Sequence, residues 1–501
     1  MPSNVRRRGP APPGHRIVTR VRSWVGREHL AWSGLAAAAL VYAATLTAAS
    51  LHRHDLFQSG YDVAIFDQGV WLLGHLDDPF STVRGRNLFA DHFQPALVLF
   101  APFGLLGIAP SALFAVQAAA LAGAGVVLGA LARTRGAPVA LAAAVGGLWL
   151  ASPLVQWANL FEFHPETMVP LLLALGALFL ERGRHALFVL SVGLACCFKE
   201  DVSLVAAAWG LVLVLRGQRR LGTGLLIGAP ALFVIATKVV MPAFGGNLDY
   251  YSKRFAGDRG TSVGSVLAYV VDHPGAALDQ LATRQNAVLI FALVACTGGL
   301  ALFAPRVLVL AVPPVAANVL SAYAYQHDLH FHYQIVAAAT VAIAGAYGAA
   351  AFAQRRPQLV RPAAWVLVLG AVGVTVAASP AIDVLRHEKP SPHAAAKRAA
   401  LAVIPSGVAV AGEPDVIAHL AERRAVYQLP EPFVSRPTNG EAWSDAELRR
   451  RATAVRYVVY STGALDPGLE SQVKSLPPLL AKRGFHVVLS SDGVVVYARG
   501  G

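Results

Sequence analysis

Charged and histidine side chains gather in a few short stretches of an otherwise apolar chain. The first stretch, SGYDVAIFDQGVW, contains Asp62 and Asp67, and ADHFQP further along adds Asp91 and His92. A carboxylate among apolar neighbours at a membrane surface can have its pKa raised toward the working range of a general base. An aspartate before an apolar run is also a common helix N-cap. The sequence therefore leaves Asp62 as either a base or a cap.

A second stretch, NLFEFHPETM, places Glu162, His164 and Glu166 within five residues. Two carboxylates and an imidazole this close together could hold a divalent metal ion. A proline followed by an acid is also typical of the first turn of a helix. Both interpretations remain open.

Lys199, Glu200 and Asp201 form a third stretch, because they interrupt an apolar run from Ala186 to Leu215. At the outer face of a membrane they would form a solvated turn. Below that face, the cost of burying charge would require them to be paired and functional.

The motif AYAYQHDLHFH contains four more candidates, His327, Asp328, His330 and His332. Histidine and aspartate could ligate a metal, but the spacing is not a recognised zinc signature. We expect a polar rim that binds substrate by hydrogen bonds and stacking.

The loop from 242 to 285 supplies Tyr251, Lys253 and Arg254. Cations and aromatic rings beside a membrane suit a phosphate headgroup. Such residues also occur simply as anchors at the membrane interface.

Composition indicates what must position these residues. Of the 501 residues 55% are hydrophobic and only 14% are charged, against about 25% charged in soluble proteins. The net charge of +13 is spread over short runs between apolar segments rather than clustered on one face, so we expect no nucleic-acid partner. The three cysteines lie in apolar stretches and predict neither a disulfide framework nor a zinc site.

The apolar segments predict an α-helical polytopic membrane protein with about eleven transmembrane helices, since a span needs about 20 residues. The segments are 30–51, 112–132, 137–152, 166–181, 186–198, 202–215, 221–241, 286–304, 306–322, 334–353 and 362–380. The basic N-terminus (1–29) leads into an apolar run too long for a signal peptide, so we expect an uncleaved first span.

Arginines in every alternate connection place the N-terminus in the cytoplasm, because short cytoplasmic loops retain Lys and Arg. This orientation holds only if the apolar run from Phe93 to Ile108 is interfacial or re-entrant rather than a full span. Most acids then fall on the outer face, in a first outer loop (52–111) and in later loops.

Residues 381–501 change character and predict an extracytoplasmic α/β domain after the transmembrane region (30–380). Alternating apolar residues favour five strands, at 407–411, 425–429, 456–460, 485–490 and 494–497.

With these motifs in hand, the chain resembles a family of uncharacterised bacterial multi-pass membrane proteins similar to the GT-C glycosyltransferase superfamily. SGYDVAIFDQGVW with DHFQP, FEFHPE, FKED and YQHDLHFHY carry the narrower resemblance, and topology and the first loop carry the broader one. GT-C enzymes have a catalytic Asp soon after the first span, and Asp62 matches it by placement. In many of them an acid follows at once, whereas here Val63 follows and Asp67 is the next acid, so either carboxylate could be the base.

The resemblance implies a GT-C-like fold and a plasma-membrane glycosyltransferase. Its donor would be a sugar linked to polyprenyl phosphate, and its acceptor an envelope glycan, lipid or protein. A divalent metal at Glu162, His164 and Glu166, or the cations Lys199, Lys253 and Arg254, would meet the donor phosphate. We expect substrate contacts from Asp91, His92, Lys199, Glu200, Asp201, Tyr251, Lys253, Arg254, His327, Asp328, His330 and His332.

Two other functions remain open. A transporter or lipid flippase would need ionisable groups deep within the spans, where the sequence has almost none, Lys238 being the main candidate. A non-catalytic envelope assembly or sensor protein would bind its partner through the C-terminal region alone.

Overall fold

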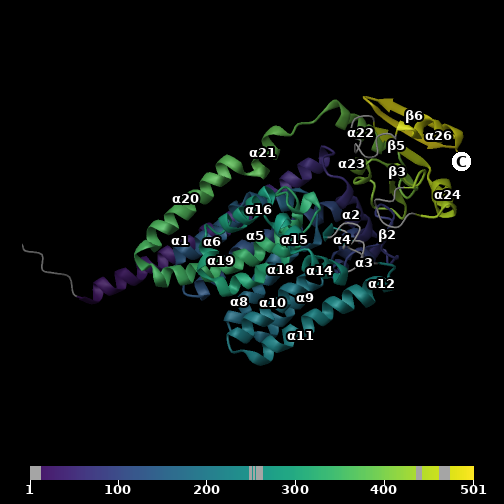
Figure 1. Ribbon diagram of the computed structural model, residues 1–501. Coiled ribbons are helices and arrows are strands. Elements are labelled where there is room, and N and C mark those ends of the chain that lie inside the picture. The colour runs from purple at the N-terminus through teal and green to yellow at the C-terminus, as the bar shows by residue number, and fades with distance from the viewer. Residues whose placement is uncertain are drawn as a thin grey trace, which may run out of the picture.

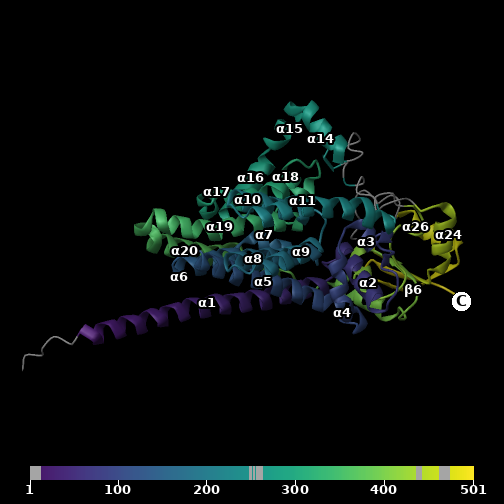
Figure 2. The same cartoon turned by 90° about the horizontal axis from the view of Figure 1, so that it is seen from below.

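The computed structural model describes residues 13–246, 251, 254–255, 263–435, 443–461 and 474–500. Helices of the first 400 residues form an elongated bundle, and a small sheet lies at one end of it (Figures 1 and 2). Lys253 lies outside the described residues.

Every predicted apolar segment coincides with helix. The bundle helices are α1 (Pro13–Asp55), α5 (Ala109–Thr134), α6 (Val139–Ala151), α7 (Pro153–Leu160), α8 (Val169–Glu181), α9 (His185–Cys196), α10 (Val202–Leu215), α11 (Arg219–Ile235), α16 (Arg284–Ala295), α17 (Pro305–Leu308), α18 (Val312–Val319), α19 (Ile335–Arg355) and α20 (Val360–Ala378). Among the described residues five helices are long and apolar enough to cross a membrane, or six if the bent pair α6–α7 is one span. The other apolar helices are shorter, so the count of eleven stays a prediction.

Helix α19 is the centre of the bundle, since every residue from Ile335 to Ala350 is buried. Its buried face is mostly alanine and glycine, which let neighbouring backbones approach closely without a hydrophobic driving force between helices. At Gly348 a Cβ atom would lie 1.8 Å from the carbonyl oxygen of Leu300. A larger residue there would push the two segments apart.

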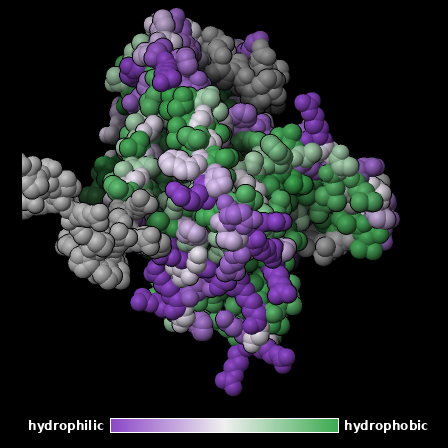
Figure 3. Space-filling model, turned by 90° about the vertical axis from the view of Figure 1, so that its left-hand side faces the viewer, coloured by the Kyte–Doolittle hydropathy of each residue, from purple (hydrophilic) through white to green (hydrophobic). Residues whose placement is uncertain are grey.

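One end of the bundle is held by two arginines that share one glutamate at the surface. Glu181, at the end of α8, accepts bonds from Arg135 (2.5 Å), Arg216 (3.0 Å) and the hydroxyl of Tyr347 (2.5 Å). Figure 3 shows hydrophilic side chains gathered over this end and hydrophobic side chains on the flanks. The connections predicted to be cytoplasmic from their arginines therefore lie together.

The first loop packs against the opposite end. It contains α2 (Tyr61–Gly74), the strand pair β1 (Phe80–Ser81) and β2 (Arg86–Asn87), and α3 (Leu88–Asp91). The run from Phe93 to Ile108 is a short 3-10 helix (Pro95–Phe100) followed by α4 (Ala101–Leu105). These two helices together have eleven residues, too few to span a bilayer. The segment is therefore not a full span, which the predicted orientation requires.

Toward the C-terminus, α21 (Pro380–His387) and α22 (Pro392–Ala402) lead to a five-stranded sheet of order β4-β3-β5-β7-β6. Strands β3 (Val410–Gly412), β4 (Val426–Gln428), β5 (Tyr457–Ser461), β6 (Phe485–Ser491) and β7 (Val494–Arg499) confirm the five predicted strands. The first three are parallel, and β7 is antiparallel to both β5 and β6. Helices α23 (Pro414–Ile417), α24 (Asp445–Ala454) and α26 (Leu476–Lys482) connect them.

The sheet region is docked on α2 and the first loop. The hydroxyl of Thr82 donates to the carbonyl of Val426 (2.6 Å) and accepts from its amide (2.9 Å), while Gln68 bonds the carbonyl of Arg423. Both side chains are buried. Helix α2 is therefore fixed between the bundle and the C-terminal region.

Candidate functional site

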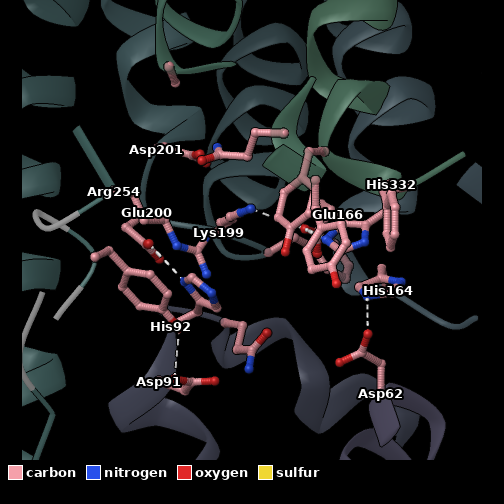
Figure 4. Close-up of a pocket in the computed structure, with 18 of the residues that line it drawn as sticks. Asp62, Asp91, His92, His164, Glu166, Lys199, Glu200, Asp201, Arg254 and His332 are labelled. Carbon is pink, nitrogen blue, oxygen red and sulfur yellow. Dashed lines mark hydrogen bonds and ion pairs between the residues drawn. The ribbon is translucent and has the colours of Figure 1, made fainter. Parts of the chain in front are cut away.

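A cavity of about 730 Å³ lies where the first loop, the sheet-side ends of the bundle helices and the late loops meet (Figure 4). Its volume is in the range of small-molecule sites, roughly 300–1,000 Å³. The ionisable residues that line it are Asp62, Arg84, Asp91, His92, His164, Glu166, Lys199, Glu200, Asp201, Tyr251, Arg254 and His332, together with Tyr61, Tyr323, Tyr325 and Tyr333.

Asp62 lies in the first turn of α2 and faces His164, with 3.3 Å between Oδ2 and Nε2. Glu162 fixes the start of this helix, because its carboxylate accepts the amides of Gly60 (2.8 Å) and Val63 (2.7 Å). The cap of α2 is thus Glu162 from a distant segment, and the side chain of Asp62 is left for the cavity.

His164 stacks on His332, with ring centroids 3.4 Å apart. On the far side of this stack, Glu166 Oε1 lies 3.3 Å from His332 Nε2 and 3.1 Å from Lys199 Nζ. Burial opposes a charge on His164, yet its hydrogen bond and ion pair with Asp62 raise the imidazole pKa. Asp62 consequently lies against an imidazole whose protonated form it favours.

A second polar group surrounds Asp91. Arg84 binds both carboxylate oxygens at 2.9 Å, Arg86 lies at 3.2 Å and the hydroxyl of Tyr251 donates at 2.8 Å. Burial would raise the pKa of Asp91, but the neighbouring arginines hold it well below its usual range. These contacts fix Asp91 as a structural anion that holds Arg84 and Tyr251 at the cavity wall.

His92 and Glu200 form the next pair, 2.9 Å apart, and Glu200 also accepts the amide of Phe93. Although burial opposes both charges, their ion pair raises the pKa of His92 and lowers that of Glu200. The third stretch is therefore paired rather than a solvated turn: Lys199 and Glu200 bond to different segments of the chain.

Arg254 differs from the other cations of the cavity. Its guanidinium lies over the rings of Tyr323 (4.4 Å), Tyr251 (4.7 Å) and Tyr333 (5.9 Å). No carboxylate in the described part of the chain lies within ion-pair distance of it. Its charge is held in place by aromatic faces and stays available to an anion.

The remaining wall of the cavity is apolar. Phe198, Leu204, Phe233, Phe255, Val266 and Ala317 line it. Phe233 belongs to α11 and Val266 to α14 (Val263–Asp272), and both helices expose apolar side chains on the outside, such as Ile235 and Val271. The cavity thus joins a polar half to an apolar half beside a lipid-facing surface.

Four predicted residues lie away from the cavity. Asp67 is buried on the other face of α2, near Glu422, and is only 1% exposed. His327 bonds Asn286 and the carbonyl of Ser321, while Asp328 and His330 pair with each other at the surface. Of the four candidates in that motif, only His332 lines the cavity, together with the motif's aromatic residues Tyr323, Tyr325 and Phe331.

The arrangement does not fit a metal centre at Glu162, His164 and Glu166. Glu162 is used by the amides of α2 and Glu166 by Lys199. Within the described residues no three histidine, cysteine or acidic side chains are grouped so that they could hold a metal ion.

Arg84 and Tyr333 were not singled out by the sequence. Arg84 lies in a short loop between two-residue strands, and only its contact with Asp91 reveals its place. Tyr333 directly follows His332, so the aromatic content of the motif was the available signal.

Fold and site together define a multi-pass membrane protein with the GT-C fold. The crystal structure of ArnT from Cupriavidus metallidurans bound to undecaprenyl phosphate superposes with a TM-score of 0.53, 14% identity, and coverage of 96% of this chain and 99% of that one. ArnT in the apo state gives a TM-score of 0.50, 14% identity and coverage of 97% and 100%. The chain therefore shares the fold of ArnT, as the expected GT-C-like fold requires.

Residues 53–496 match the model of a family described as "Predicted membrane protein (DUF2079)", and the chain belongs to this family. No curated protein matches it.

Proposed function

We propose that this protein is a GT-C-type glycosyltransferase that transfers a sugar from a polyprenyl-phosphate-linked donor to an acceptor on the outer face of the plasma membrane. The observation that carries the proposal is one cavity that contains the Asp62–His164 pair, an apolar wall, and Arg254, which has no carboxylate partner among the described residues.

Asp62 is the proposed base. Sugar transfer needs a group that takes the proton of the acceptor hydroxyl as the new glycosidic bond forms. Asp62 is partly exposed at the cavity, and its helix is fixed at the start by Glu162. His164, 3.3 Å away, orients the Asp62 carboxyl group between turnovers.

Arg254 is the proposed partner of the donor phosphate, which gains negative charge as the bond to the sugar breaks. Most other charges of the cavity are already paired: Arg84 with Asp91, Lys199 with Glu166 and His92 with Glu200. An anion that enters the cavity therefore finds one cation without a carboxylate partner among the described residues.

The apolar half suits the lipid part of the donor. A polyprenyl chain buries apolar surface, and each CH₂ removed from water contributes about 0.8 kcal/mol. Because α11 and α14 are apolar both toward the cavity and toward the outside, the chain can reach lipid without crossing a polar surface. ArnT has been crystallised with undecaprenyl phosphate, which supports this class of ligand.

The test compares Asp62→Asn with Asp67→Asn in membranes supplied with a labelled undecaprenyl-phosphate sugar. Both acids lie on α2, but only Asp62 lines the cavity. We expect Asp62→Asn to reduce transfer by about 10²–10⁴-fold, the usual contribution of a general base, and Asp67→Asn to retain most of it.

Equal transfer by wild type and Asp62→Asn would contradict the assignment of Asp62 as the base. Movement of the labelled lipid across proteoliposome membranes with no glycan product would instead favour a flippase.

A further inference from the structure

Three consecutive charged residues directly precede α10, and their side chains lie in three different environments. Lys199 binds Glu166 and Glu200 binds His92, so both charges are satisfied by the protein. Asp201 also lines the cavity, but its buried Oδ1 has no hydrogen-bond partner anywhere in the described residues.

Asp201 occupies the N-cap position of α10, where an aspartate normally accepts an amide of the first turn. Its side chain makes no such bond. The amides of Val202, Ser203 and Leu204 bond instead to the backbone carbonyls of Lys199, Glu200 and Asp201. The carboxyl group therefore does not cap the helix by a hydrogen bond, although it occupies the position where it could.

A buried polar atom without a partner costs free energy, so its retention calls for an explanation. Burial raises the pKa of Asp201, and the nearby Lys199 opposes that shift. Figure 4 shows Asp201 on the opposite side of the view from Asp62, with Lys199 between them. A ligand that contacts Asp62 at one end and Asp201 at the other would extend across the polar half of the cavity.

Resting on the proposed function, we infer that Asp201 recognises the transferred sugar by accepting a hydrogen bond from one of its hydroxyl groups. The ligand of this subsite is the polyhydroxylated headgroup of the donor, whereas Arg254 holds its phosphate. Asp201 is thus a specificity residue: it distinguishes a sugar-bearing lipid phosphate from the bare lipid phosphate that remains after transfer.

The experiment measures binding of two lipids to purified protein in nanodiscs: undecaprenyl phosphate, and undecaprenyl phosphate carrying glucose, galactose, mannose or N-acetylglucosamine. The sugar-bearing lipid that wild type binds most tightly is used for the comparison. We expect Asp201→Ala to weaken the binding of that lipid about 10–100-fold, the range for a hydrogen bond to a charged group. The affinity for undecaprenyl phosphate should change less than about twofold.

Two further variants keep the outcomes apart. Asp201→Asn retains one acceptor oxygen and should lose less affinity than Asp201→Ala, while Asp328→Ala, on the surface outside the cavity, should bind both lipids as wild type does. Unchanged undecaprenyl phosphate binding also shows that a variant is folded.

The inference about Asp201 is overturned if Asp201→Ala binds the sugar-bearing lipid as tightly as wild type. It is also overturned if the variant loses affinity for both lipids equally. If wild type binds neither lipid, the proposed function itself fails. These two failures are distinguishable because the second appears before any substitution is made.

Discussion

Asp62 and Asp67 lie five residues apart on α2, and their surroundings give the two carboxyl groups different chemistry. Asp67 is buried, its Oδ1 has no hydrogen-bond partner among the described residues, and burial followed by the charge of Glu422 raises its pKa well above the usual range. An acid whose folded-state pKa is raised stabilises the fold fully below its unfolded pKa, near 4, and loses that contribution as pH rises through the folded value.

We therefore expect Asp67→Asn to be more stable than wild type at pH 8, by about 2 °C in Tm, and to lose this advantage near pH 4. Thermal unfolding of the detergent-solubilised protein at several pH values measures it. The exposed Asp383 provides the control, since Asp383→Asn should behave as wild type throughout. A variant that melts below wild type at pH 8 would contradict the buried-acid interpretation.

The same pair shows what sequence reveals about single residues. Residue type and motif singled out Asp62, Asp91, Lys199 and His332, because charged groups in an apolar chain are costly unless they are used, and the structure brings these four residues to one cavity. Sequence could not choose between Asp62 and Asp67. Which side of α2 faces the cavity depends on Glu162, which lies about 100 residues further along the chain and accepts the first amides of this helix.

At the scale of elements, the start of α2 is the feature that positions the proposed base. Burial, followed by the charge of Asp62, raises the pKa of Glu162 to about 7, against the lowering effect of its two amide bonds. The carboxylate that caps α2 is therefore lost as pH falls below about 7, and the hold on Asp62 weakens with it.

Glu162→Gln should abolish this dependence. We expect transfer by wild type to fall between pH 8 and pH 6, and transfer by the variant to be about tenfold lower at pH 8 and free of the inflection near 7. Undecaprenyl phosphate binding should be unchanged, because Arg254 is on other segments. An unaltered pH profile in the variant would show that Glu162 does not position Asp62.

Docking of the sheet region on the first loop also depends on single contacts between elements. Thr82 is buried and satisfies both backbone groups of Val426, whereas Asp77 pairs with Arg424 at the surface. Thr82→Val leaves buried groups without partners and should cost about 2 kcal/mol of stability. Asp77→Asn removes an exposed ion pair and should cost less than about 0.5 kcal/mol.

Limited proteolysis and denaturant unfolding measure this difference. Equal sensitivity of the two variants would mean that the sheet region is held elsewhere. Strand positions were predictable because β3 to β7 lie in short runs rich in valine and other apolar residues. The docking was not predictable, since the contacts of Thr82 and Gln68 leave no local pattern in the sequence.

At the scale of the whole molecule, the two ends of the bundle differ in chemistry, and we expect them to lie in different compartments. Arg135 and Arg216 meet at Glu181 at one end, and the cavity lies at the other ends of the same helices, α5, α8 and α10. Helices α8 and α10 have 13 and 14 residues, about 20 Å. This is less than the roughly 30 Å of a hydrocarbon core, so a cavity at their far ends lies within reach of lipid chains.

From the positive-inside rule we expect the arginine end to lie in the cytoplasm and the cavity outside. In a background with the three cysteines replaced by alanine, Asp328→Cys and Asp383→Cys should react with a membrane-impermeant maleimide in right-side-out vesicles, and Arg184→Cys only after permeabilisation. All three positions are exposed. Labelling of positions 184 and 328 from the same side would contradict the orientation. If instead position 184 reacts from outside and position 328 only after permeabilisation, the orientation is reversed, and the acceptor and lipid-linked donor would have to meet the cavity from the cytoplasm.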